Sequence, residues 1–159
     1  AKDLYEKLAN QYPESNMIND ALDRIMFLEE AAEADSLHVQ TLISAWKKEL
    51  SGDTAAAERM LRSLADGGGT LASMARVELG ELLRSEGKLE EAAAALAPLA
   101  EGDGPKEEIT SRGVYLLART LADMDRGEEA LRHCQLVIAG NEHSYWARRA
   151  RSLAGTLTE

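Results

Sequence analysis

The 34 residues from Ala72 to Pro105, ASMARVELGELLRSEGKLEEAAAALAPLAEGDGP, decide the fold class of this chain. Apolar residues recur at helical spacing on both sides of a turn signal, Glu86-Gly87-Lys88. The pattern predicts two helices, over about 70–86 and 88–101, joined as an antiparallel hairpin. Because Pro98 falls inside the second helix, we expect it to kink that helix or end its regular part.

The same arrangement of small and large apolar residues occurs three times along the chain, at spacings of 35 and 38 residues. Small residues stand where two helices of a hairpin must approach closely, and larger apolar residues follow one and two turns later. The small positions are Ala45, Gly80 and Ala118, followed twelve residues later by Ala57, Ala92 and Ala130. The larger positions are Leu61, Leu96 and Cys134, and then Leu64, Leu99 and Val137.

This pattern resembles the tetratricopeptide repeat, a helix hairpin of about 34 residues. The middle unit has residues at or beside most of the family's expected places: Leu79-Gly80, Leu83, Gly87, Ala92, Leu96 and Gly104-Pro105. Three residues differ from the usual ones: Arg76 replaces an aromatic residue, Leu83 replaces a Tyr, and Leu99 replaces a small residue. The resemblance implies an all-α fold, a right-handed α-solenoid of antiparallel helix hairpins. Tyr5, Leu8 and Pro13 look like the end of an earlier repeat, so we interpret the chain as a segment of a longer stack.

Turn signals divide the chain into about nine helices within one continuous domain. The expected units are a partial preceding repeat with a connecting helix at 1–35, repeat-like units at 36–69, 70–105 and 106–142, and a capping helix at 143–159. Ser15, Ser36, Asp53, Thr70 and Asp125 are the expected N-caps. The expected helices cover about 2–12, 16–34, 36–50, 53–66, 70–86, 88–101, 106–124, 126–139 and 143–157.

Composition supports a helical protein and restricts its partners. The 159 residues include 26 Ala and 23 Leu against nine Val plus Ile, which favours helix over sheet. The net charge of −10 argues against general nucleic-acid binding, since phosphates would be repelled. No stretch approaches the roughly 18 apolar residues of a membrane span. The single Cys134 excludes a disulfide framework, which suits the cytoplasm and a cysteine-poor cell-envelope protein equally, so the compartment stays unknown.

No pattern typical of catalysis, cofactor binding or metal binding stands out, so we do not expect an enzyme. His38, His133 and His143 lack the paired spacing of a helical zinc site, and Cys134 stands where a buried apolar residue is expected. Gly67-Gly68-Gly69 lacks the Lys-Ser/Thr of a phosphate-binding loop, so we interpret it as a turn between repeats.

The repeat register instead places a set of side chains on the inner helix of each hairpin, where a groove could hold a protein or peptide partner. Packing between repeats is the alternative reading for its apolar members Leu42, Trp46 and Val77. The places at which chaperone-tail clamps carry Lys and Asn hold other residues, so we expect no such clamp. The groove residues are Val39, Leu42, Trp46 and Glu49, then Met74, Val77, Glu81 and Arg84, then Arg112, Tyr115 and Arg119.

The last helix carries Trp146, Arg148, Arg149 and Arg151, which either form the polar outer face of a cap or bind an acidic partner. Residues 1–35 carry three basic and nine acidic side chains, so head-to-tail association of two copies is one such arrangement.

We therefore expect a non-catalytic interaction or scaffold module of a larger protein. The segments around Tyr12-Pro13 and Asn19-Asp20 resemble repeats of bacterial cell-envelope proteins, and cytoplasmic scaffolds share that pattern. The open alternative is a regulatory or targeting arm of a multidomain enzyme or sensor whose active domain lies outside this sequence.

Overall fold

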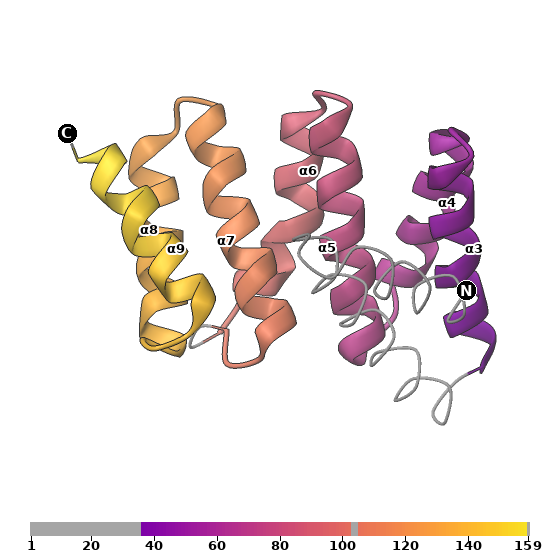
Figure 1. Ribbon diagram of the computed structural model, residues 1–159, viewed down its shortest axis with the longest axis horizontal. Helices are drawn as coiled ribbons and strands as arrows, with labels where there is room; N and C mark the ends of the chain where they lie inside the picture. Colours follow the sequence, from indigo (N-terminus) through magenta and orange to yellow (C-terminus); the bar gives the residue numbers. More distant parts are fainter. Residues whose placement is uncertain (1–35, 103–104, 159) are drawn as a thin grey trace, which may run out of the picture. The chain divides into compact units, whose positions relative to one another are not determined.

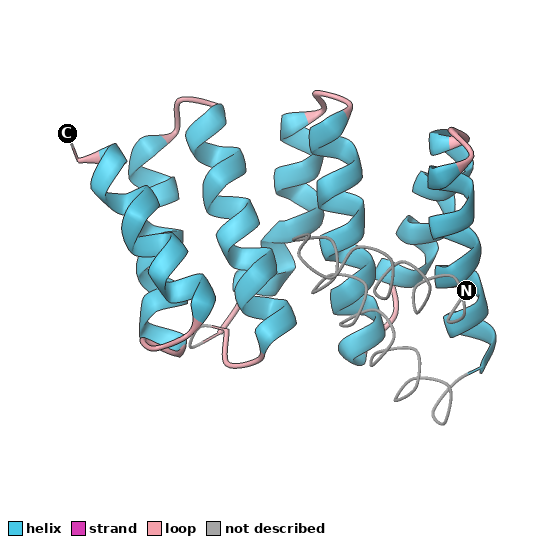
Figure 2. Ribbon diagram, viewed as in Figure 1, coloured by secondary structure: helices cyan, strands magenta, loops and turns pink. Residues whose placement is uncertain are grey.

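The computed structural model describes residues 36–102 and 105–158, and this part of the chain is helical (Figure 1). Figure 2 shows helices joined by short turns, with no strand among the described residues. The expected all-α class is therefore confirmed, while the helices expected over 2–12 and 16–34 lie outside the described residues. The helices are α3 (Ser36–Leu50), α4 (Thr54–Ala65), α5 (Gly69–Ser85), α6 (Leu89–Leu96), the 3-10 helix η1 (Ala97–Ala100), α7 (Glu108–Asp123), α8 (Gly127–Gly140) and α9 (Tyr145–Leu157).

The chain forms two compact units, residues 1–60 and 61–159, which are described separately. In the second unit, α5 packs against α6 and α7 packs against α8, so each pair forms a helix hairpin. Helix α7 also contacts α5, α6, η1 and α9, and it lies between the α5/α6 hairpin and the last helix (Figure 1). Helix α7 therefore lies beside both α5, the first helix of the preceding hairpin, and α9, the last helix.

The core of the second unit lies between these helices. Val77 of α5, Leu96 of α6, Val114 of α7 and Val137 of α8 are all fully buried in it. Pro98 ends the regular α-helix as expected: α6 stops at Leu96, and the chain continues as η1. The predicted single helix over 88–101 is therefore two shorter segments.

Three helices, α3, α5 and α7, end in the same backbone turn. Gly52, Gly87 and Asp125 take left-handed φ angles of 82°, 75° and 59° at equivalent places. In each turn the next amide donates a hydrogen bond of 2.9 Å to the carbonyl five residues earlier, which is the Schellman arrangement. These turns are 35 and 38 residues apart, the spacing of the repeated alanines. The repetition therefore extends from the sequence to the backbone geometry.

The repeated sequence positions are also equivalent in burial. Ala57, Ala92 and Ala130 are fully buried, and the larger residues that follow them are all buried, with Leu99 the most exposed at 8%. Gly80 shows why one of the small positions must be small, because a Cβ added there would lie 2.7 Å from Cγ and Cδ2 of Leu96.

The helix starts confirm some of the expected caps and correct others. Asp53 is a cap, because its Oδ1 accepts a hydrogen bond of 3.3 Å from the Ala56 amide. Thr70 is not a cap, since α5 already begins at Gly69, and Asp125 is not a cap, since it ends the preceding helix with a positive φ. Ser144, which the sequence reasoning missed, caps α9 by accepting from the Ala147 amide at 3.0 Å. Ser15 lies outside the described residues. Ser36 is the first described residue and the first residue of α3.

Candidate interaction surface

In the first unit, the expected groove residues of α3 are mostly enclosed by protein. Val39, Leu42 and Trp46 are 5%, 0% and 3% exposed, whereas Glu49 is exposed. The three apolar side chains therefore offer little surface to a partner in this structure.

In the second unit, the expected groove residues separate into core and surface. Val77 is fully buried in the core, and Met74 is half-buried on the same helix. Tyr115 is 7% exposed, so only an edge of its side chain reaches solvent. The polar members Glu81, Arg84 and Arg112 are half-buried, and Arg119 is exposed.

Two ion pairs connect α5 to α7 across this surface. Arg112 donates a hydrogen bond of 2.7 Å to Glu81 Oε1, and Arg84 donates to Asp123 Oδ2. Both arginines were expected to face a partner, and both make contacts within the unit. Asp123 was not among the expected site residues, although it lies four residues after Arg119 and so on the same side of α7.

An aromatic contact connects α7 to α9. The rings of Tyr115 and Trp146 are 5.5 Å apart between centroids, and Trp146 Nε1 donates a hydrogen bond of 2.5 Å to Glu108 Oε1. The Tyr145 ring lies edge-on to Trp146, with a centroid separation of 4.9 Å. Tyr145 is half exposed, so this contact reaches the surface of the molecule.

Arg149 lies against two of these rings. Its guanidinium carbon is 5.7 Å from the Tyr115 centroid and 5.9 Å from the Tyr145 centroid, both within cation–π range. The hydrogen bond to Tyr115 is the largest cause of the raised pKa of Arg149. Arg149 is therefore a fixed positive charge on the surface.

Two further guanidinium groups lie around Tyr115. Arg119 is one helical turn from Tyr115 on α7, and Arg84 faces α7 from α5. Burial lowers the pKa of Arg84, Asp123 opposes that change, and the neighbouring charge of Arg119 lowers the pKa further. We call Arg84, Arg119 and Arg149 together the arginine cluster.

The remaining terminal arginines, Arg148 and Arg151, are exposed on α9. Among the described residues, no carboxylate lies within ion-pair distance of either one or of Arg119 and Arg149. Helix α9 itself contains no acidic residue, so it is a locally positive element in an acidic chain.

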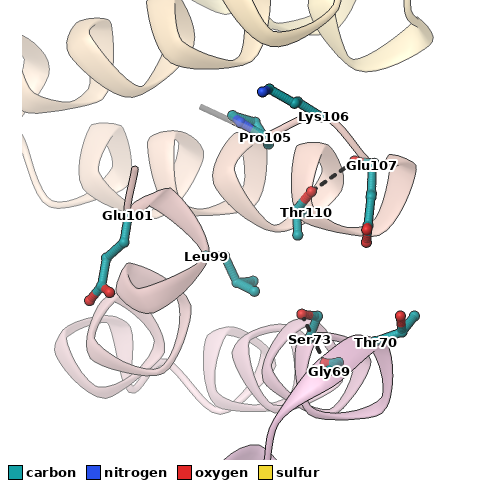
Figure 3. A pocket seen from close by; sticks show the side chains of 9 residues that line it. All are labelled: Gly69, Thr70, Ser73, Leu99, Glu101, Pro105, Lys106, Glu107 and Thr110. Atoms are coloured by element: carbon teal, nitrogen blue, oxygen red, sulfur yellow. Dashed lines mark hydrogen bonds between the residues drawn. The ribbon is translucent and has the colours of Figure 1, made fainter. Parts of the chain in front are cut away.

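A separate pocket of about 490 Å³ lies between the start of α5, η1 and the start of α7 (Figure 3). Two of its hydroxyl groups donate to the local backbone: Ser73 to the Gly69 carbonyl at 3.4 Å, and Thr110 to the Glu107 carbonyl at 2.9 Å. Among the described residues, neither of these two hydroxyl groups is hydrogen-bonded to a side chain of the lining. The residues around it are Gly69, Thr70, Ser73, Leu99, Glu101, Pro105, Lys106, Glu107 and Thr110.

Neither the three histidines nor Cys134 belong to the arginine cluster or line the pocket. Cys134 is fully buried in the core, and burial raises the pKa of its thiol to about 11, so it behaves as the expected small apolar residue. His38 and His143 are exposed, and burial lowers the pKa of the half-buried His133. Within the described residues, no three His, Cys, Asp or Glu side chains come together as metal ligands. No described helix is both long and apolar enough to cross a bilayer.

No protein-family model, curated protein or solved structure matches this chain.

Proposed function

We propose that this chain is a non-catalytic protein-recognition module, a right-handed solenoid of tetratricopeptide-like hairpins that holds a partner across the surface of α5, α7 and α9. Two features support the repeat architecture: the turn that recurs at Gly52, Gly87 and Asp125, and the row formed by α5, α7 and α9. A row of neighbouring helices of this kind provides an extended surface for a peptide or protein segment.

The observation that carries the proposal is the arginine cluster around Tyr115. Three guanidinium groups from three adjacent helices share one surface, with Asp123 paired to Arg84. Arginine and aromatic side chains are the residues that most often dominate binding energy at protein interfaces. A purely structural surface of an acidic chain has no comparable need to gather positive charge in one place.

Affinity capture with the full chain tests this proposal. The variant Arg119→Glu plus Arg149→Glu reverses two charges of the cluster, and Lys106→Glu plus Arg132→Glu reverses two exposed charges outside it. Both variants change the net charge by the same amount. We expect the first variant to lose specific partners that wild type and the control variant retain.

Retention of every partner by the cluster variant, with its far-UV circular dichroism unchanged, would contradict the proposal. Equal loss in both variants would show that total charge, not this surface, selects the captured proteins.

A further inference from the structure

The three members of the arginine cluster differ in their contacts with the rest of the chain. Arg84 is partly buried and already paired with Asp123. Arg149 is positioned by two tyrosine rings, and Arg119 is exposed one turn from Tyr115. Neither Arg119 nor Arg149 is paired with a carboxylate of the described residues, so both guanidinium groups can still donate hydrogen bonds to a bound carboxylate.

We propose that Arg119 and Arg149 bind two carboxylates of an acidic, extended segment of a partner protein, one on each side of Tyr115. This inference rests on the proposed recognition function and specifies the chemistry of the partner. A guanidinium donates two parallel hydrogen bonds to a carboxylate, which a lysine ammonium does not reproduce.

The contacts of Arg149 favour this role. Contacts with two aromatic rings restrict the rotamers of a side chain that is otherwise flexible, so less conformational entropy is lost when a carboxylate binds. Tyr145, which is half exposed, supplies one of these rings and so acts as a positioning residue.

The surrounding charges favour a short acidic ligand. Arg119 and Arg84 are close enough for their like charges to interact. Asp123, paired with Arg84, and the charge of Glu81 offset this repulsion in part. Two carboxylates of a ligand would relieve that repulsion. A long polyanion such as nucleic acid would also be repelled by the rest of the chain, whose net charge is −10. A short acidic peptide interacts mainly with the positive charges near it, because salt screens the more distant ones.

The direct test is fluorescence anisotropy with a labelled peptide of alternating Glu and Gly, titrated with the full chain. The matched probe carries Gln in place of each Glu. We expect saturable binding of the Glu peptide, at least about tenfold weaker binding of the Gln peptide, and an affinity that falls as salt rises.

The variants separate a positioned site from general charge attraction. We expect Arg119→Gln and Arg149→Gln each to weaken binding about tenfold, and Arg149→Lys to recover little of the loss because the planar fork is missing. Tyr145→Leu keeps every charge and should still weaken binding several-fold. Arg132→Gln, an exposed arginine of α8, is the control of equal charge and should leave the affinity within about twofold.

An equal loss in Arg132→Gln and Arg149→Gln would overturn the inference, as would full recovery by Arg149→Lys. If the Glu peptide does not bind while captured partners still depend on the cluster, the acidic ligand is wrong and the recognition function stands. Stronger binding of duplex DNA than of the Glu peptide would also overturn the inference.

Discussion

Replacement of Gly80 by alanine distinguishes close helix packing from local helix propensity, because the two effects change the free energy of unfolding in opposite directions. Gly80 lies inside α5, where alanine is favoured over glycine by about 1 kcal/mol on propensity alone. The added Cβ would lie 2.7 Å from Cγ and Cδ2 and 2.8 Å from Cδ1 of Leu96. Leu96 is fully buried, and in a close-packed interior its neighbours limit how far it can move.

The expected magnitude follows from these contacts. Overpacking of a close-packed core costs about 1–3 kcal/mol, and contact with three atoms of one buried side chain places Gly80→Ala at the upper end. After the propensity gain, the free energy of unfolding should fall by about 2 kcal/mol. Leu96→Ala alone should cost about 3 kcal/mol through lost burial and a cavity.

The double variant supplies the decisive comparison. With Leu96 shortened, the Gly80→Ala methyl group enters the vacated space, so the substitution should now stabilise the protein by about 1 kcal/mol. The coupling between the two sites is then about 3 kcal/mol. Urea denaturation of all four proteins, followed by far-UV circular dichroism, measures each term.

A second glycine serves as a matched control. Gly155 lies in α9, and a Cβ there would meet no heavy atom within 4 Å. Gly155→Ala should therefore stabilise the protein by up to about 1 kcal/mol. If Gly80→Ala also stabilises wild type, or if its effect adds to that of Leu96→Ala, the close approach of α5 and α6 is wrong.

Three further predictions concern the turns and the core. Asp125→Gly should raise the free energy of unfolding by about 0.5–1 kcal/mol, because φ is positive at this position. Gly87→Asp, at the equivalent turn, should lower the free energy of unfolding by about 1 kcal/mol. If urea denaturation shows that both substitutions change stability in the same direction, this account of the turn is wrong. The Cys134 thiol should be unreactive toward a disulfide reagent at about pH 8 until the protein unfolds. Since its folded pKa of about 11 exceeds the ordinary thiol value of 9.0, the folded state keeps a proton that the unfolded state releases. Stability should therefore fall more steeply in wild type than in Cys134→Ala as pH rises through that window. Gly140→Ala should destabilise the protein by about 3 kcal/mol or more, because the new Cβ would clash with the backbone carbonyl of Pro105. A melting temperature equal to that of wild type would contradict this contact.

Much of the fold could be predicted from local patterns. The spacing of Ala57, Ala92 and Ala130 identified residues that are fully buried, and Pro98 ended its helix as expected. The caps at Thr70 and Asp125 were predicted wrongly because a polar residue within two positions of a glycine fits either side of a helix boundary. Only the backbone angles decide between those two sides.

The candidate surface was less accessible to sequence reasoning. A helical stripe that includes Arg112, Tyr115 and Arg119 can be read from spacing, but the burial of Tyr115 depends on how α9 packs against α7. The placement of Arg149 against Tyr115 and Tyr145 likewise depends on the register between two helices. No local pattern in the sequence encodes that register.

Hydrogen–deuterium exchange of the full chain, free and saturated with the Glu–Gly peptide or with a captured partner, tests the central claim most directly. The account predicts slower exchange on binding in the second half of α7 and the first half of α9, with α6 and α8 unchanged. Protection confined to α6 and α8, or spread evenly over all the described helices, would contradict recognition through the surface of α5, α7 and α9.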